Sequence, residues 1–283
     1  MNRDKKIVVI GAGPAGASAA YYLTEQGYQV TVLEKEAFVG GRTHGYEDNQ
    51  VRFDTGASFF TNFYPLLKEL VNKLNMQNEV IELERKVGLK YHDQIAEFRF
   101  GSFGSFWNLP FINNKDKWIM IWNTIKLSLK RSKLDLVSPD KLAAVDDASI
   151  ADWATEKMSE NIYQFLIRPG VEPFWYFSCN DVSRAMTTVL QARAADAKFY
   201  TFQHGMARIS EKLLEKSDLK LNATVTDIKV NGKVEIGYTI SKESKQITAD
   251  YLVMATPATI TAKLLKAQLN NPIGHFISSQ KYV

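Results

Sequence analysis

The beginning of the chain alternates between apolar and polar stretches in a way that predicts a strand, a helix and a second strand. Ile7–Ile10 form a β-branched run typical of strands that are buried on both faces. Ala15–Ala20 is rich in alanine and predicts a slim helix that ends near Gly27. Gln29–Leu33 then alternates apolar and polar residues, as a strand does. This order predicts the βαβ unit of a parallel sheet.

The rest of the chain has a mixed, mostly helical middle and an end that is rich in strands. After Asn231-Gly232, a dipeptide typical of hairpin turns, the alternation continues, which predicts antiparallel pairing there. The predicted elements are, in order, a helix over Tyr64–Leu74, strands over Val80–Tyr91 and Ile95–Phe100, helices from about Asp116 to Gln191, a helix over Ile209–Glu215, and strands over Leu221–Val230, Val234–Ser241 and Gln246–Met254.

Three glycines after the first strand predict a site for a dinucleotide. Gly11, Gly13 and Gly16 follow Ile10 in the spacing Gly-x-Gly-x-x-Gly. The first permits a tight turn, the second lets the backbone approach a pyrophosphate, and the third lets the helix pack close to the strand. Pro14 and Ala15 open a helix whose N-terminal N–H groups favour phosphate. An ordinary glycine-rich turn is the alternative.

A carboxylate at the end of the second strand strengthens the prediction. Glu34 lies 18 residues after Gly16, near the place where a carboxylate accepts hydrogen bonds from ribose hydroxyls. A negative charge there disfavours the 2′-phosphate of NADP. The nucleotide is therefore FAD or NAD.

A second glycine turn bears on that choice. Gly40, Gly41, Arg42 and Thr43 offer further donors for phosphate oxygens, which a plain NAD domain does not need here. The small residues Gly56, Ala57 and Ser58 lie between aromatic residues, and such a segment could run beside a flat ring system. A turn followed by core aromatics explains the same pattern.

In these motifs the chain resembles the flavin-dependent amine oxidase superfamily, which includes monoamine oxidases, protoporphyrinogen oxidases and phytoene desaturases. The resemblance extends to Phe202–Ser210, to Leu221–Ile228 and to Ala249–Pro257. It implies FAD as cofactor and adds Lys35, Val225 and Thr256 to the expected site. The full set of expected cofactor-binding residues is Gly11, Gly13, Pro14, Ala15, Gly16, Glu34, Lys35, Gly40, Gly41, Arg42, Thr43, Gly56, Ala57, Ser58, Val225 and Thr256.

The resemblance also implies an α/β fold, in which a Rossmann-like FAD-binding domain with a parallel sheet and a β-meander carries an inserted α+β, mostly helical substrate domain. The expected bounds are residues 1–65 and 200–283 for the FAD-binding domain and 66–199 for the insertion. Within the insertion, Ser149–Trp153, Ile167–Pro169 and Asp181–Ser183 resemble protoporphyrinogen oxidases and desaturases more than monoamine oxidases. His204 departs from the family, whose members often have glycine there.

Composition excludes several classes of protein. With 45% hydrophobic and 23% charged residues, and no apolar run approaching a membrane span, the chain is expected to be soluble. Its single cysteine, Cys179, cannot form an internal disulfide and fits a reducing, cytoplasmic compartment. We interpret Cys179 as a buried structural side chain. No Cys/His cluster has the spacing of metal ligands, so no metal site is expected.

The net charge of +4 is concentrated in residues 115–141, which carry seven Lys/Arg and three Asp. Trp118, Trp122, Ile125 and Leu129 recur there at helical spacing, with lysines beside them. Such a helix could lie on an anionic membrane surface. The alternative is a helix that buries its tryptophans within its own protein. Nucleic acid is not expected as a partner, because the patch is short and lacks a binding motif.

The expected function is that of a flavin-dependent oxidoreductase acting on a small organic molecule. A cyclic tetrapyrrole precursor is the leading candidate substrate, as in protoporphyrinogen oxidases, followed by an amine and a polyene. No residue is predicted to be catalytic, and the sequence does not predict an oligomeric state. Relatives continue well past Val283, so we expect a C-terminal truncation and weak binding of FAD. The rival predictions are a non-catalytic FAD-binding fragment and an NAD-dependent dehydrogenase.

Overall fold

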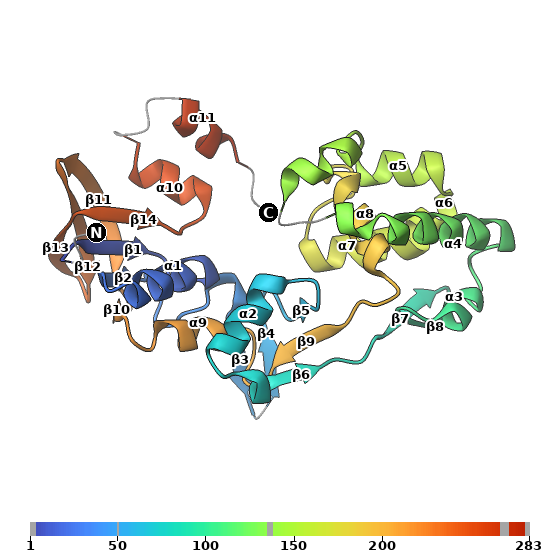
Figure 1. The fold of residues 1–283 in the computed structure, drawn as a ribbon, viewed down its shortest axis with the longest axis horizontal. Coiled ribbons are helices and arrows are strands. Elements are labelled where there is room, and N and C mark those ends of the chain that lie inside the picture. Colours follow the sequence, from blue (N-terminus) through green and yellow to red (C-terminus); the bar gives the residue numbers. More distant parts are fainter. Residues whose placement is uncertain (1–3, 50, 135–137, 267–271, 281–283) are drawn as a thin grey trace. The chain divides into compact units, whose positions relative to one another are not determined.

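The computed structural model describes residues 4–49, 51–134, 138–266 and 272–280 and divides into two compact units (Figure 1). The first unit contains Met1–Glu82 and Tyr200–Tyr282, and the second contains Leu83–Phe199. The second unit is therefore an insertion between the two segments that build the first.

A parallel sheet forms the centre of the first unit. Its strands lie in the order β10 (Asp218–Lys220), β2 (Gln29–Leu33), β1 (Lys6–Ile10) and β14 (Tyr251–Met254). Helix α1 (Pro14–Glu25) connects β1 to β2. Buried residues of α1 and of α9 (Arg208–Leu214) belong to one hydrophobic core cluster. The predicted βαβ unit is thus present, with its strands paired in parallel.

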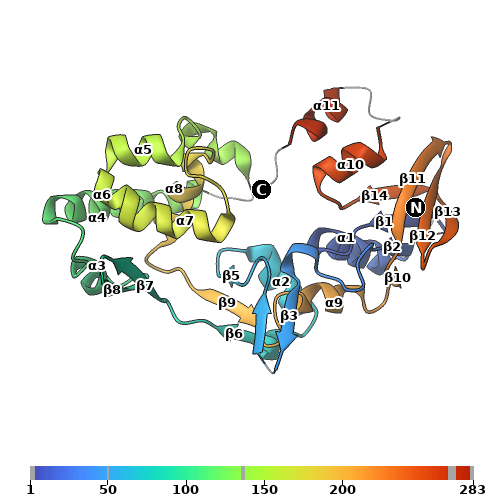
Figure 2. The same ribbon diagram turned by 180° about the vertical axis from the view of Figure 1, so that it is seen from behind.

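A three-stranded meander covers the other face of this sheet. It consists of β11 (Thr224–Asn231), β12 (Lys233–Ile240) and β13 (Glu243–Ala249), all antiparallel (Figure 2). Ile7 and Val9 belong to the core cluster on the α1 face, whereas Val8 and Ile10 belong to the cluster with the meander. Both faces of β1 are buried, which explains its uninterrupted apolar run. Each such side chain contributes roughly 1.5–3 kcal/mol of hydrophobic stabilisation.

The predicted strand over Gln246–Met254 is wrong as a single element. Its first part belongs to the meander as β13, and its second part enters the parallel sheet as β14. Asp250 lies between the two, where its carboxylate accepts a hydrogen bond from the Lys6 amide at 2.9 Å and pairs with the Lys5 Nζ at 3.1 Å. These contacts hold the chain where it passes from one sheet to the other.

The remaining elements of the first unit surround these layers. They are η1 (Gly41–Thr43), β3 (Gly45–Asp48), β4 (Val51–Asp54), β5 (Phe60–Thr61), α2 (Pro65–Lys73), η2 (Gln77–Glu79), β6 (Val80–Glu82), β9 (Phe199–Phe202), α10 (Ala258–Leu264) and α11 (Pro272–Ser279). Strands β3 and β4 pair as a hairpin, and β5, β9 and β6 form a small sheet.

The boundary expected after residue 65 differs from the structure. Helix α2 and strand β6 belong to the first unit, which continues to Glu82. Leu70 and Val71 of α2 are buried in the same cluster as Phe60 and Phe202, so this helix completes the core of the first unit. The predicted strand over Val80–Tyr91 is accordingly two strands that belong to different sheets.

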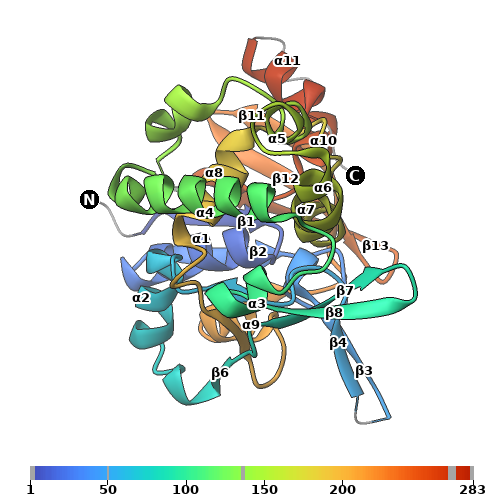
Figure 3. The same ribbon diagram turned by 90° about the vertical axis from the view of Figure 1, so that its right-hand side faces the viewer.

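The second unit is a helical layer with one hairpin (Figure 3). Its elements are β7 (Lys86–Tyr91), β8 (Gln94–Arg99), α3 (Phe103–Trp107), α4 (Asn114–Leu129), η3 (Arg131–Lys133), η4 (Pro139–Val145), α5 (Ile150–Lys157), α6 (Glu160–Ile162), a π-helical turn over Tyr163–Ile167, α7 (Arg168–Trp175) and α8 (Arg184–Arg193). Ile150, Ile162 and Cys179 lie at the centre of its core and are fully buried. Asn113, Ser149 and Ser159 begin helices by accepting N–H groups on their side chains.

Candidate functional site

The turn after β1 packs so closely that two of its positions require glycine. Gly11 has a φ of +102°, and a Cβ there would lie 2.8 Å from the carbonyl oxygen of Ala255. A Cβ on Gly16 would lie 1.9 Å from the carbonyl oxygen of Gly11. Both distances are far inside van der Waals contact. The two glycines therefore fix the start of α1 at the carboxyl end of β1, between β1 and β14.

The N-terminus of α1 is open to an anion. Gly13 is the N-cap and makes no side-chain cap, and Pro14 occupies the first helical position. The amides of Ala15 and Gly16 precede the first bond within the helix, which runs from Ala17 N to Gly13 O at 2.9 Å. Because helix dipoles place partial positive charge at this end, the turn suits a phosphate.

The second glycine turn faces the first. A Cβ on Gly13 would lie 3.9 Å from the carbonyl oxygen of Gly40 and 4.0 Å from the Cα of Gly41. The Gly40 amide donates to the carbonyl oxygen of Ala12 at 2.9 Å, and the Thr43 hydroxyl donates to the carbonyl oxygen of Gly40 at 2.9 Å. The two glycine turns thus lie close together through their backbones.

A third loop joins these two through the backbone. The Ala57 amide donates to the carbonyl oxygen of Arg42 at 3.0 Å. A Cβ on Gly56 would lie 2.1 Å from the same oxygen, so the two loops are in direct contact. Arg42 and Ala57 are exposed to solvent.

Glu34 is buried and directed toward the first glycine turn. Its exposed fraction is 7%. One carboxylate oxygen accepts from the Ala12 amide at 2.7 Å, and the other accepts from the Glu36 amide at 2.9 Å. A carboxylate has about four lone-pair positions, so this group could accept two further hydrogen bonds, for example from a ribose.

Two later segments reach the same region. The Ala223 amide donates to the carbonyl oxygen of Glu34 at 2.7 Å, which brings the half-buried Val225 of β11 near the end of β2. The Ala255 amide donates to the carbonyl oxygen of Ile10 at 2.9 Å. Thr256, the next residue, lies 2.8 Å from Thr261 between their hydroxyl oxygens.

The structure does not bring every expected residue into this cluster. Lys35 is exposed and pairs with Glu36 at 3.0 Å. Ser58 is exposed.

Sequence reasoning missed a pair of contacts beside the expected site. The carboxylate of Asp54 accepts from the Met206 amide at 3.2 Å, and Arg208 binds Glu79 through two nitrogens at 2.6 and 3.3 Å. The hydrogen bond from Arg208 holds the pKa of Glu79 below its usual range, and the same bond raises the pKa of Arg208. Together these contacts fix the turn that contains His204. Because the Glu79 and Arg208 partners are 129 residues apart, no local pattern reveals them.

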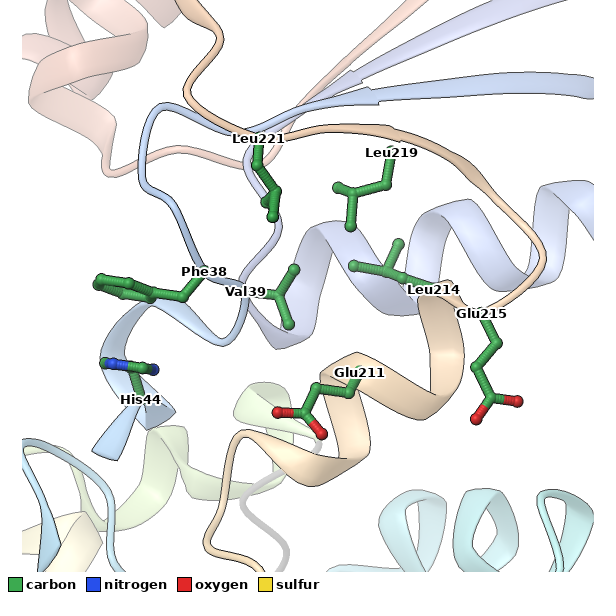
Figure 4. A pocket seen from close by; sticks show the side chains of 8 residues that line it. All are labelled: Phe38, Val39, His44, Glu211, Leu214, Glu215, Leu219 and Leu221. Carbon is green, nitrogen blue, oxygen red and sulfur yellow. The ribbon is translucent and has the colours of Figure 1, made fainter. Parts of the chain in front are cut away.

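A separate hollow of about 360 Å³ lies beside Val39 and α9 (Figure 4). Its lining residues are Phe38, Val39, His44, Glu211, Leu214, Glu215, Leu219 and Leu221. The two carboxylates already pair, Glu211 with Arg208 at 3.3 Å and Glu215 with Lys212 at 2.9 Å. The hollow is lined by none of the expected cofactor residues, and we do not assign it to the nucleotide.

Other candidate chemistry is limited in the part of the chain that the structure describes. There, no three His, Cys, Asp or Glu side chains gather as they would around a metal ion. Burial raises the pKa of the Cys179 thiol to about 11, which keeps the thiol protonated and fits a structural side chain. No helix within the described ranges is long and apolar enough to cross a membrane.

The parallel sheet, the paired glycine turns, the buried Glu34 and the meander define a dinucleotide-binding flavoprotein with an inserted domain. The chain belongs to the family of flavin containing amine oxidoreductases, whose model matches residues 14–281. Proteins of this family are FAD-dependent oxidoreductases. The predicted family, fold class and cofactor are therefore confirmed.

Curated relatives show how far the similarity extends. An L-amino-acid oxidase of Bothrops pauloensis is 24% identical over 93% of this chain and 54% of its own length. A 1-hydroxycarotenoid 3,4-desaturase of Flavobacterium sp. (strain P99-3) is 40% identical over 80 residues, which is 28% of this chain. The chain thus spans about half the length of the relative that it matches throughout.

Solved structures show the same fold. Putrescine oxidase with bound putrescine has a TM-score of 0.70 and 19% identity, and covers 92% of this chain and 60% of its own. A putative protoporphyrinogen oxidase from Exiguobacterium sp. 255-15 has a TM-score of 0.67 and 15% identity, and covers 96% of this chain and 63% of its own. At these identities the likeness shows the fold alone.

Proposed function

We propose that this chain provides the FAD-binding part of an oxidoreductase that removes a hydride equivalent from a small organic substrate. The observation that carries the proposal is the position of Glu34. Its carboxylate binds the Ala12 amide in the first glycine turn, while its backbone binds Ala223 beside Val225. A bound flavin would supply the hydride-accepting ring, and the protein would supply its position.

Each group of residues has a distinct proposed role. The amides of Ala15 and Gly16, with the backbone of Gly40–Thr43, hold the diphosphate, which is supported by the close approach of the two glycine turns at the start of α1. Glu34 accepts the hydroxyls of the adenosine ribose, and the backbone of Val225 lies against the adenine. Asp54 positions the turn at Met206 through their hydrogen bond of 3.2 Å.

For the substrate, we retain a cyclic tetrapyrrole precursor as the leading candidate, with an amine and a polyene as alternatives. The choice of a tetrapyrrole precursor is supported by the segments that begin at Ser149, Ile167 and Asp181, which resemble protoporphyrinogen oxidases. Two of these segments pack together, because Ile150 N donates to Val182 O at 2.8 Å and Arg184 N donates to Ala148 O at 3.0 Å. Their role in this unit is structural, so they support the kind of helical domain more than any substrate contact.

Binding of the nucleotide is tested by titrating the protein with FAD and with FMN, which lacks the adenylate, and following flavin fluorescence. We expect FAD to bind more tightly than FMN. Glu34→Gln should weaken FAD by roughly 10- to 100-fold, the value of hydrogen bonds to a buried charged acceptor, and leave FMN unchanged. Glu243→Gln, at an exposed residue of the meander, is the matched control. Equal affinity for FAD and FMN would contradict the assigned roles.

The reaction is tested separately by mixing the FAD-loaded protein anaerobically with a porphyrinogen, a primary amine, an L-amino acid or a polyene. Loss of the visible absorbance of oxidised flavin identifies the substrate class. A protein that holds FAD but is reduced by none of the four would be a non-catalytic flavin-binding protein. Binding of NADH without binding of FAD would favour a dehydrogenase.

A further inference from the structure

Helix α4 of the second unit presents its largest apolar side chains to solvent. Trp118, Trp122, Ile125 and Leu129 have exposed fractions of 57%, 60%, 45% and 82%. Their spacing places them along one side of the helix. We call these four residues, with the neighbouring Lys115, Lys126, Lys130 and Lys133, the tryptophan face. The expectation that this helix buries its tryptophans is wrong for the chain that the structure describes.

The opposite side of α4 packs against its own unit, where Met120 and Leu127 lie against core clusters and polar contacts add to this packing. Thr124 accepts from the Gln191 side chain at 2.9 Å, and Ser128 donates to the carbonyl oxygen of Ala192 at 3.2 Å. Asp116 is 5% exposed and accepts from the hydroxyl of Ser159 at 2.8 Å. Helix α4 is therefore apolar on both sides, whereas a surface helix in water carries polar residues on its outward side. The exposed apolar side calls for an apolar partner on the tryptophan face.

Neighbouring aromatic residues extend the same surface. Trp107 of α3 lies edge-on to Trp118 with ring centroids 5.4 Å apart, and Phe103 stacks on Trp107 at 5.6 Å. Phe103 is 58% exposed. Lys126 Nζ lies 5.9 Å from the centre of the Trp122 ring. Aromatic rings with lysine ammonium groups beside them are typical of protein surfaces at the lipid headgroup level.

The charge of this surface indicates which partner it fits. Asp116 is the only acidic residue between Asn114 and Lys133, and it is buried. Among the described residues, the four lysines of the tryptophan face form no ion pair, whereas Arg131 pairs with Asp196 at 2.9 Å. A surface that is both apolar and uniformly basic complements a bilayer with anionic headgroups.

We infer that the tryptophan face binds the surface of an anionic lipid bilayer, with the rings at the headgroup level and the lysines against lipid phosphates. The inference does not depend on the proposed function, because it uses only residues of the second unit. It also needs no membrane-spanning segment, since an interfacial helix lies in the plane of the membrane.

The test is sedimentation of the protein with vesicles of phosphatidylcholine, alone or containing phosphatidylserine. We expect binding to the anionic vesicles only, weakened when ionic strength rises above about 0.15 M. Lys126→Gln combined with Lys130→Gln should weaken binding by roughly 25-fold, about fivefold for each charge. Trp118→Ala combined with Trp122→Ala should weaken it by roughly tenfold or more. Lys216→Gln combined with Lys229→Gln, at exposed lysines of the first unit, should bind like the unchanged protein.

A local measurement places the contact on the helix itself. Brominated lipids should quench the tryptophan fluorescence of the unchanged protein, and Trp118→Phe with Trp122→Phe should remove most of the quenching while binding persists. Four results would overturn the inference: no binding to either vesicle, equal binding to both, binding that the α4 variants leave unchanged, or self-association that requires Trp118 and Trp122. The last would assign the face to a second copy of the chain.

Discussion

Glu34 offers a test of the site that needs no cofactor. Both of its carboxylate oxygens accept backbone amides, from Ala12 at 2.7 Å and from Glu36 at 2.9 Å, and the side chain is only 7% exposed. In Glu34→Gln the amide group replaces one acceptor with a donor, so one backbone N–H faces another N–H. An unsatisfied buried donor costs about 1–3 kcal/mol, and the remaining bond loses its charge assistance. We expect the first unit to lose about 2–4 kcal/mol of stability.

The two units provide separate signals for this measurement. All five tryptophans lie within Leu83–Phe199, so tryptophan fluorescence reports on the second unit, whereas circular dichroism reports on both. In urea, Glu34→Gln should move part of the circular dichroism transition to lower denaturant and leave the fluorescence transition in place. At about 2–4 °C for each kcal/mol, the corresponding thermal shift is roughly 4–16 °C. A change below about 0.5 kcal/mol, the range of ordinary surface substitutions, would refute the reasoning about Glu34.

Three further predictions concern both units. Gly16→Ala should leave little folded protein, because its Cβ would lie 1.9 Å from a carbonyl oxygen. In contrast, the Cβ of Gly170→Ala in α7 would meet nothing within 4 Å, and this variant should be more stable than the unchanged protein by up to about 1 kcal/mol in thermal melts. Glu79→Gln should cost about 1 kcal/mol at neutral pH. The pKa of Glu79 is lowered in the folded state, so the contribution of Glu79 to stability is present above the ordinary glutamate pKa, near 4.3, and is lost as the pH falls through the folded value. Stability measured against pH should therefore fall less steeply in acid for the variant than for the unchanged protein. Cys179 should resist a thiol reagent at pH 8 until urea unfolds the second unit, because burial raises the pKa of its thiol to about 11, and rapid labelling of the native protein would contradict this.

The first βαβ unit could be predicted because its signals are local. Ile7–Ile10 is apolar at every position since both faces of β1 are covered, and Gly11 is needed for a turn with φ of +102°. The approach of Gly41 to Gly13 is not local, and it was expected only because both turns were assigned to one dinucleotide.

Other features depend on contacts that sequence patterns do not contain. The alternation over Gln246–Met254 runs through Asp250 without a break, so the change of sheet at that residue depends on its contacts with Lys5 and Lys6. The direction of α4 was equally ambiguous, because Trp118 and Trp122 define a stripe but not which way it faces. The packing of Met120 and Leu127 on core clusters and the hydrogen bond of Thr124 with Gln191 determine which side of the helix is buried.

The two ends of the second unit lie side by side. Leu83 N donates to Phe199 O at 2.8 Å, and in the adjoining pair of strands Glu82 lies opposite Tyr200. A short linker from Glu82 to Tyr200 could therefore close the first unit without its insertion, and the excised Leu83–Phe199 could be joined end to end. The chain thus enters and leaves the helical domain at neighbouring residues, so whole domains could be exchanged there while the nucleotide-binding half keeps its sequence.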